Sequence, residues 1–218
     1  MKRHSLYTAL ALAGAVALSS IAYADDTHYS GFFLGAGGGY NKPDLPGSSF
    51  SVTNGTSTNT VTATSSKYMF DVYGGYLFDM GSGFDLGPLL AFNYFSPYTV
   101  TKSTSVDEKT NIYNVSLEVV GQYTWQSFFT RVGVGEGYFR THGNQSSGSS
   151  NLLANETQWT ALAGATVGYY FTPSFDVGVF YQHVFGSTVG GGNTIPRMNS
   201  LGLSVEYVFG GMGSSASV

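Results

Sequence analysis

The residues that could do chemistry are few, because only 10% of the 218 residues are charged and none is cysteine. A chain without cysteine has no disulfide scaffold, no thiolate metal site and no cysteine nucleophile. Beyond the N-terminal segment the histidines are His28, His142 and His183. The other candidates are carboxylates and one arginine that recur inside regular segments: Asp71, Asp85, Glu118, Arg131, Asp176 and Glu206. Such groups could pair as buried ions or line a path for small ions.

Two of these groups are expected to meet. A turn near Trp125 and Gln126 would pair segments 113–123 and 128–138 and set Arg131 diagonal to Glu118, within reach of a salt bridge. We therefore predict an interior polar network that consists of Arg131, Glu118, Asp71 and Glu206. Its expected role is to satisfy buried charges, and the alternative is a narrow small-solute channel gated by the Arg131–Glu118 pair. We predict no catalytic, cofactor-binding or metal-ligating residue, and no cofactor.

The segments that carry these residues alternate with a period of two, which is typical of β-strands. In segment 68–78, for example, Tyr68, Phe70 and Val72 alternate with Met69 and Asp71. Eight segments follow this pattern: 31–40, 68–78, 84–94, 113–123, 128–138, 158–171, 175–185 and 201–209. Seven of them have the 9–11 residues that a tilted membrane strand needs, and segment 158–171 is longer. We therefore predict an all-β fold with eight strands.

The connections between the segments distinguish a membrane barrel from a soluble sandwich. Long connections (41–67, 96–110, 141–156 and 186–198) alternate with short ones (79–83, 124–127 and 172–174). In an up-and-down meander this places every long loop at one end, as in outer-membrane barrels, whereas a Greek-key sandwich would scatter its loop lengths. The long segments are rich in Ser, Thr, Asn and Gly, so we expect mobile, solvated external loops that carry surface interactions.

Aromatic residues lie at the ends of the face expected to turn outward. Val, Leu and Ala occupy the centres of the same faces. The terminal aromatic residues include Tyr68, Phe78, Phe84, Tyr94, Tyr113, Tyr123, Phe128, Tyr138, Trp159, Phe171, Phe175, Tyr181 and Phe209. This distribution is typical of interfacial girdles around an apolar band.

The N-terminal segment predicts export. Lys2 and Arg3 precede an apolar run at 6–21, and an A-x-A cleavage site ends at Ala24. We expect a signal peptide at 1–24, a short lead at 25–30, a barrel at 31–209 and a short tail at 210–218. The chain has a net charge of −4 and becomes more acidic when Lys2 and Arg3 are removed. Nucleic-acid binding is not expected, because it requires clustered Lys and Arg.

At this point the chain resembles the OmpA-like eight-stranded outer-membrane barrels, a family that includes opacity-type surface proteins. The resemblance rests on the export signal and on three strands, which begin Gly31-Phe32-Phe33-Leu34-Gly35, Arg131-Val132-Gly133-Val134-Gly135 and Asp176-Val177-Gly178-Val179-Phe180. It also rests on the final strand, 200–209. It implies a closed, antiparallel up-and-down transmembrane barrel in the outer membrane of a Gram-negative bacterium.

The resemblance also implies partners. Residues Gly202, Val205, Tyr207 and Phe209 of the final strand resemble the insertion signal that the barrel-assembly machinery reads. Periplasmic chaperones, outer-membrane lipid and lipopolysaccharide are the other expected partners, with a host or surface ligand on the loops. Some eight-stranded barrels modify lipid A, and the deacylase type has a lipid-facing His with Ser two residues later. Here Phe185 follows His183 at that spacing, so a lipid A-modifying enzyme stays a second alternative and no catalysis is expected.

Overall fold

The described part of the chain is built of β-strands. The structure is a computed structural model that describes residues 30–44, 50–54, 57–65, 67–102, 107–145, 157–188 and 194–209. Its strands are β1 (Gly31–Asp44), β2 (Phe50–Asn54), β3 (Ser57–Ser65), β4 (Tyr68–Asp79), β5 (Phe84–Lys102), β6 (Asp107–Trp125), β7 (Phe128–Gln145), β8 (Thr157–Thr172), β9 (Phe175–Val184), β10 (Ser187–Thr188), β11 (Thr194–Ile195) and β12 (Arg197–Phe209).

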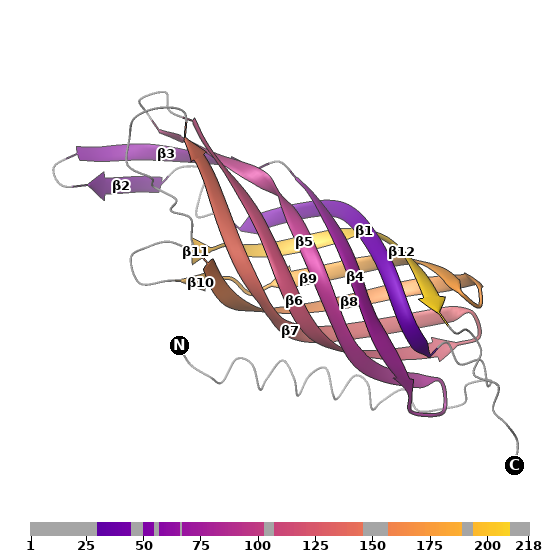
Figure 1. The fold of residues 1–218 in the computed structure, drawn as a ribbon. Helices are drawn as coiled ribbons and strands as arrows, with labels where there is room; N and C mark the ends of the chain where they lie inside the picture. The colour runs from indigo at the N-terminus through magenta and orange to yellow at the C-terminus, as the bar shows by residue number, and fades with distance from the viewer. Residues whose placement is uncertain are drawn as a thin grey trace, which may run out of the picture.

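Eight long strands close into an antiparallel barrel (Figure 1). The order β5-β4-β1-β12-β9-β8-β7-β6 returns to its start because β6 also pairs with β5. The first and last barrel strands meet along thirteen residue pairs, from Phe32 with Phe209 to Asp44 with Arg197. The predicted up-and-down barrel is confirmed. Closure gives every barrel strand two neighbours, which a structure inside lipid requires because no water is present to bind an open edge.

Side chains alternate across the wall as the period of two predicts. In β12, Leu201, Leu203 and Val205 are exposed, and Ser204 and Glu206 are buried. Thirty large hydrophobic side chains are exposed among the described residues. The surface patches of a soluble monomer contain far fewer.

Glu136 lies on the outward face of β7. The pairing of β7 is continuous on both sides of this residue, which excludes a bulge there. No helix among the described residues is long and apolar enough to span a membrane.

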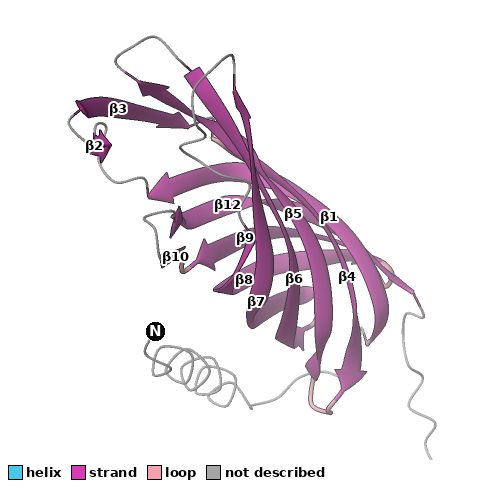
Figure 2. Cartoon of the chain, turned by 60° about the vertical axis from the view of Figure 1, so that its left-hand side comes forward, coloured by secondary structure: helices cyan, strands magenta, loops and turns pink. Residues whose placement is uncertain are grey.

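The long connections were expected to be loops, and this expectation is wrong for much of their length. Within 41–67, β2 and β3 form a hairpin, and β3 pairs with β5 from Val61 with Lys102 to Ser65 with Tyr98. Within 96–110, β5 and β6 continue past an irregularity between Phe95 and Tyr98. Thr and Val have high β propensity, and an extended neighbour supplies partners for their backbone groups. Figure 2 shows β2 and β3 projecting beyond one end of the barrel.

The opposite end has tight turns. Gln126 and Ser127 alone join β6 to β7, and Gln126 has a positive φ of 54°. The turn from β4 to β5 has positive φ at Gly81, Ser82 and Gly83. The predicted signal peptide at 1–24 and the tail at 210–218 lie outside the described residues, as does the lead at 25–30 apart from Ser30.

Glycines on the inner face make room for rings. A Cβ at Gly35 would overlap the ring of Tyr73, and one at Gly168 would overlap the ring of Phe129. Gly75 lies against Phe33 in the same way. These glycines therefore act as packing positions that let large aromatic side chains fold flat against the inner wall.

Candidate functional site in the barrel lumen

The lumen has an apolar layer at each end. Near the long strand extensions, one cluster consists of Met69, Phe95, Ile112, Phe139, Leu162, Phe180, Val184, Ile195 and Met198. Near the tight turns, a second cluster consists of Phe33, Leu77, Leu89, Ala91, Val120, Phe129, Tyr170 and Val208, with Tyr73 packed against it. We call these the outer and inner clusters. Polar groups line the space between the two clusters, and Arg131 lies over the rings of Phe33 and Phe129 in the inner cluster.

Arg131 is the centre of the strongest polar arrangement. It is 5% exposed and Glu206 is 2% exposed. Its Nη1 donates to Glu206 Oε2 at 2.6 Å, and its Nη2 donates to Oε1 at 2.8 Å. The guanidinium also lies over the ring of Phe33, at 4.7 Å from the ring centroid. A bidentate pair with this geometry satisfies both charges, and the apolar surroundings strengthen it.

Gln122 completes this arrangement. Its Oε1 accepts from Arg131 Nε at 2.9 Å and from Nη2 at 2.7 Å. Its Nε2 donates to Tyr170 Oη at 3.0 Å. Arg131, Glu206, Gln122 and Tyr170 therefore bridge strands on opposite sides of the lumen. This network has the character of a structural crosslink.

The prediction that Arg131 pairs with Glu118 is wrong. The turn at Gln126 and Ser127 sets Trp125 opposite Phe128, so Gln122 faces Arg131 and Glu118 faces Gly135. Glu118 is thereby four residues along β6 from the residue opposite Arg131, and the ion pair that Arg131 makes is with Glu206. The actual carboxylate partner comes from β12, on the far side of the barrel. Only closure of the barrel brings the two together.

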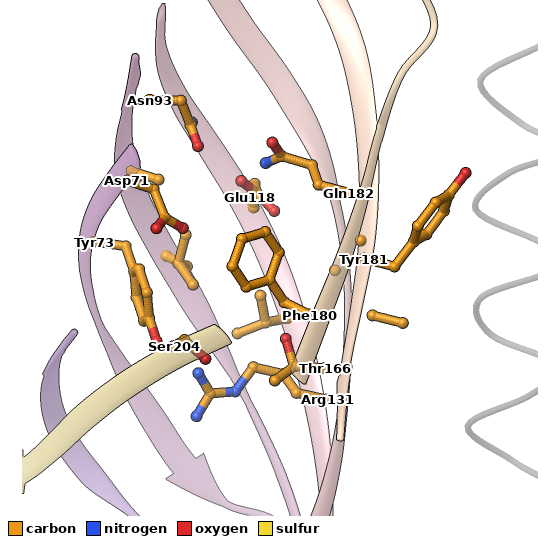
Figure 3. Close-up of a pocket in the computed structure, with 16 residues that line it drawn as sticks. Asp71, Tyr73, Asn93, Glu118, Arg131, Thr166, Phe180, Tyr181, Gln182 and Ser204 are labelled. Atoms are coloured by element: carbon orange, nitrogen blue, oxygen red, sulfur yellow. The ribbon is translucent and has the colours of Figure 1, made fainter. Parts of the chain in front are cut away.

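Glu118 and Asp71, the other two predicted network residues, line a cavity that Arg131 also borders. The cavity has a volume of about 70 Å³. Phe180 of the outer cluster and Leu89, Ala91 and Val120 of the inner cluster line it, so it lies between the two apolar layers. Figure 3 shows Asp71, Asn93, Glu118 and Gln182 pointing toward this common space.

The hydrogen bonding of these cavity residues is incomplete. Glu118 Oε1 accepts from Ser116 Oγ at 3.0 Å. Asn93 donates through Nδ2 to Asn114 Oδ1 at 2.8 Å, which leaves its own Oδ1 buried without a hydrogen-bond partner. Asp71 Oδ1 and Gln182 Oε1 are likewise buried and have no hydrogen-bond partner in the described structure. Sequence reasoning did not single out Asn93 or Gln182, although both share the inward parity of the predicted residues.

The other candidate residues lie away from the lumen. Val205, Tyr207 and Phe209 of the predicted insertion signal are exposed on β12, and Gly202 turns inward beneath the ring of Phe180. Nothing in this geometry bears on recognition by the assembly machinery.

His183 is half-buried near the outer rim. Its Nδ1 lies 2.8 Å from Asn199 Oδ1, and its ring packs edge-on against Phe185 at 4.7 Å between centroids. No serine is among the described contacts of this histidine. The described residues also contain no group of three or more His, Cys, Asp or Glu that could hold a metal.

Four basic side chains are exposed at the outer rim of the barrel. Lys42, Lys67, Arg140 and Arg197 are exposed at the end that carries the long extensions. Strand alternation turns Lys42, Arg140 and Arg197 outward, and Lys67 Nζ lies 5.7 Å from the centroid of the outward-facing Tyr40 ring. Apart from Arg131, these are all the Lys and Arg residues whose side chains the structure describes.

Comparison with known proteins identifies the fold. No family model matches the sequence, and no curated protein does. Among solved structures, outer membrane protein OprG from Pseudomonas aeruginosa matches with a TM-score of 0.53 and 15% identity, over 84% of this chain and 99% of that one.

Two further barrels match at lower scores. Neisserial surface protein A matches with a TM-score of 0.47 and 17% sequence identity, over 83% of this chain and 98% of that one. Ail, the attachment invasion locus protein of Yersinia pestis, matches with a TM-score of 0.47 and 15% sequence identity, over 83% of this chain and 97% of that one. The match to OprG shows that the fold is that of eight-stranded outer-membrane barrels, and the apolar exterior is consistent with a place in the bacterial outer membrane.

Proposed function

We propose that this chain is an integral outer-membrane protein that serves as a rigid support for a surface-exposed recognition end, without catalysis. The observation that carries the proposal is the polarity of the barrel. One end has tight turns, whereas at the other β2, β3, β5 and β6 extend past the apolar band. Strands that project beyond the membrane expose backbone and polar side chains where an external ligand can reach them.

The test is labelling of single introduced cysteines. Because the chain has no cysteine of its own, each introduced cysteine is the only thiol that can react. Thr58→Cys, in β3, should react with a membrane-impermeant maleimide on intact cells. Met80→Cys, which replaces a residue 60% exposed at the opposite end, should react only after the outer membrane is opened. Both variants should run faster on gels when unboiled, as folded barrels do. Labelling of Met80→Cys alone on intact cells, or of both variants equally, would contradict the proposed orientation.

We further propose that the basic outer rim binds the phosphates of an anionic glycolipid in the outer leaflet. Lys42, Lys67, Arg140 and Arg197 lie just beyond outward-facing aromatic residues such as Tyr40, Tyr68 and Tyr138. A basic residue near an anionic membrane surface contributes about 1 kcal/mol. The expected lipid is therefore the phosphorylated lipid A portion of lipopolysaccharide.

Lipid binding can be measured as a rise in the thermal unfolding temperature of the barrel in detergent. Bisphosphorylated lipid A should raise it more than the monophosphorylated form does. The fourfold variant Lys42→Gln, Lys67→Gln, Arg140→Gln and Arg197→Gln should lose this difference. The matched control, with Lys→Arg or Arg→Lys at the same positions, should keep it. Equal stabilisation by both lipids in the natural protein would refute lipid binding at the rim.

A channel and a lipid A-modifying enzyme are less well supported. A continuous path would have to cross both the outer and the inner cluster, and eight strands enclose little more than their own side chains. His183 has Asn199 and Phe185 as its described neighbours, which does not resemble a nucleophile and base arrangement. The proposal therefore assigns the lumen a structural role and the outer end the recognition role.

A further inference from the structure

The lumen cavity is lined by several acceptor oxygens, three of which are buried without a hydrogen-bond partner. Asp71 and Glu118 contribute carboxylates, and Asn93 and Gln182 contribute amide oxygens. Asn93 is 0% exposed, and its Oδ1, the Asp71 Oδ1 and the Gln182 Oε1 are buried without a hydrogen-bond partner. Burying a polar atom without a partner is costly, so each of these atoms indicates something positive or hydrogen-donating in the cavity.

No side chain among the described residues supplies that positive charge. Arg131 is the basic residue that lines the cavity, but its guanidinium donates to Glu206 and Gln122. The exposed Lys and Arg residues lie at the outer rim, beyond the outer cluster. Asp71 and Glu118 therefore face the cavity without a cationic partner, which would leave two negative charges inside the barrel.

We propose that this cavity binds a hard cation of the Ca²⁺ class, held by Asp71, Asn93, Glu118 and Gln182. Carboxylate and amide oxygens together with water are the ligands that Ca²⁺ prefers, and it takes six to eight of them. A volume of about 70 Å³ has room for roughly five water-sized occupants, enough for a partly hydrated ion. Two carboxylates neutralise a divalent cation. The set lacks imidazole and thiolate, which disfavours a transition metal.

The four ligands come from four different strands, so a bound cation would link these strands to one another. Asp71 lies on β4, Asn93 on β5, Glu118 on β6 and Gln182 on β9. Asp71 and Asn93 are directly opposite each other, whereas Gln182 approaches from the other wall. A bound ion would thus crosslink the lumen between the two apolar clusters, beside the Arg131–Glu206 pair. This role is independent of the surface recognition proposed above.

The experiment is equilibrium dialysis of radioactive Ca²⁺ against the full barrel, refolded in nonionic detergent without lipopolysaccharide. We expect one saturable site per chain that fills below about 1 mM Ca²⁺. Asp71→Asn and Glu118→Gln should each weaken binding at least tenfold. Asn93→Leu removes an amide oxygen without changing the charge and should weaken it several-fold.

Two variants serve as matched controls. Glu136→Gln removes a carboxylate from the lipid-facing wall, and Asp176→Asn removes one that is buried in the lumen but does not line the cavity. Both should bind Ca²⁺ as the natural protein does, and every variant must show the faster unboiled band of a folded barrel. A folded natural barrel without saturable binding would overturn the proposal, as would binding that Asp71→Asn and Glu118→Gln leave unchanged.

Discussion

At the scale of single residues, the chemistry of the lumen is divided between two arrangements that share one layer. Arg131 and Glu206 satisfy each other's charge, and Gln122 accepts two further hydrogen bonds from the guanidinium, through Nε and Nη2. Asp71 and Glu118 have no such partner and face a cavity. The inward parity of all four charged residues follows from strand alternation. Which of them meet depends on distances across the barrel.

Removal of one member of the Arg131–Glu206 pair should destabilise the barrel strongly. Arg131→Met leaves Glu206 as a buried, uncompensated charge, with an expected cost of about 3–5 kcal/mol in the free energy of unfolding. Glu206→Gln should have a comparable effect on its own, while the double variant should lose less than the two single losses added together. Urea unfolding of the barrel in lipid vesicles measures all three.

The matched control for this cycle lies on the same strand. Arg140→Met removes an exposed guanidinium at the outer rim and should change the free energy of unfolding by less than about 0.5 kcal/mol. If the losses of the two single variants simply add in the double variant, the pair does not act as a unit and the crosslink interpretation fails.

At the scale of elements, strands extend further along the chain than the polar composition of the long connections predicted. Segment 41–67 reads as a polar loop by its Ser, Thr and Asn content, yet it contains the β2–β3 hairpin and pairs with β5. Polar composition measures solvation, and a strand that stands beyond the membrane is solvated too. In β3, Val61 and Ala63 alternate with Thr residues, and this period of two could have predicted the strand.

The glycines of the barrel show a second element-level effect. Gly35 and Gly168 each lie beneath an aromatic ring from a neighbouring strand, Tyr73 and Phe129 respectively. The period of two alone places Gly35 and Gly168 on the inward face of their strands. The matching of a particular glycine with a particular ring needed the register, because a shift by one residue turns each side chain to the other face.

At the scale of the whole molecule, the lumen has an apolar cluster toward each end, and the Arg131 network packs against rings of the inner cluster. The cavity lies between the two apolar clusters. A passage for ions would need water through both apolar layers. The cross-section of an eight-stranded barrel is already filled by inward side chains.

We therefore expect no discrete conductance from the barrel in planar lipid bilayers at moderate voltage. The measurement should use protein whose unboiled band confirms folding, with an empty-detergent control. Discrete steps that change when Arg131→Met or Glu118→Gln is introduced would instead support the narrow small-solute channel. This result is separable from cation binding, since an ion held at one site does not by itself carry a current.

The sequence by itself determined the fold class, the eight barrel strands, the face on which each side chain lies and the end at which the long connections gather. These follow from local periodicity and spacing, which need no knowledge of distant contacts. Only the tertiary structure decided that Arg131 pairs with Glu206 and that Asn93 and Gln182 join Asp71 and Glu118 around a cavity. Arg131 and Glu206 are separated by 75 residues along the chain. The shape of the closed barrel sets which side chains meet across its lumen, and no local pattern records that shape.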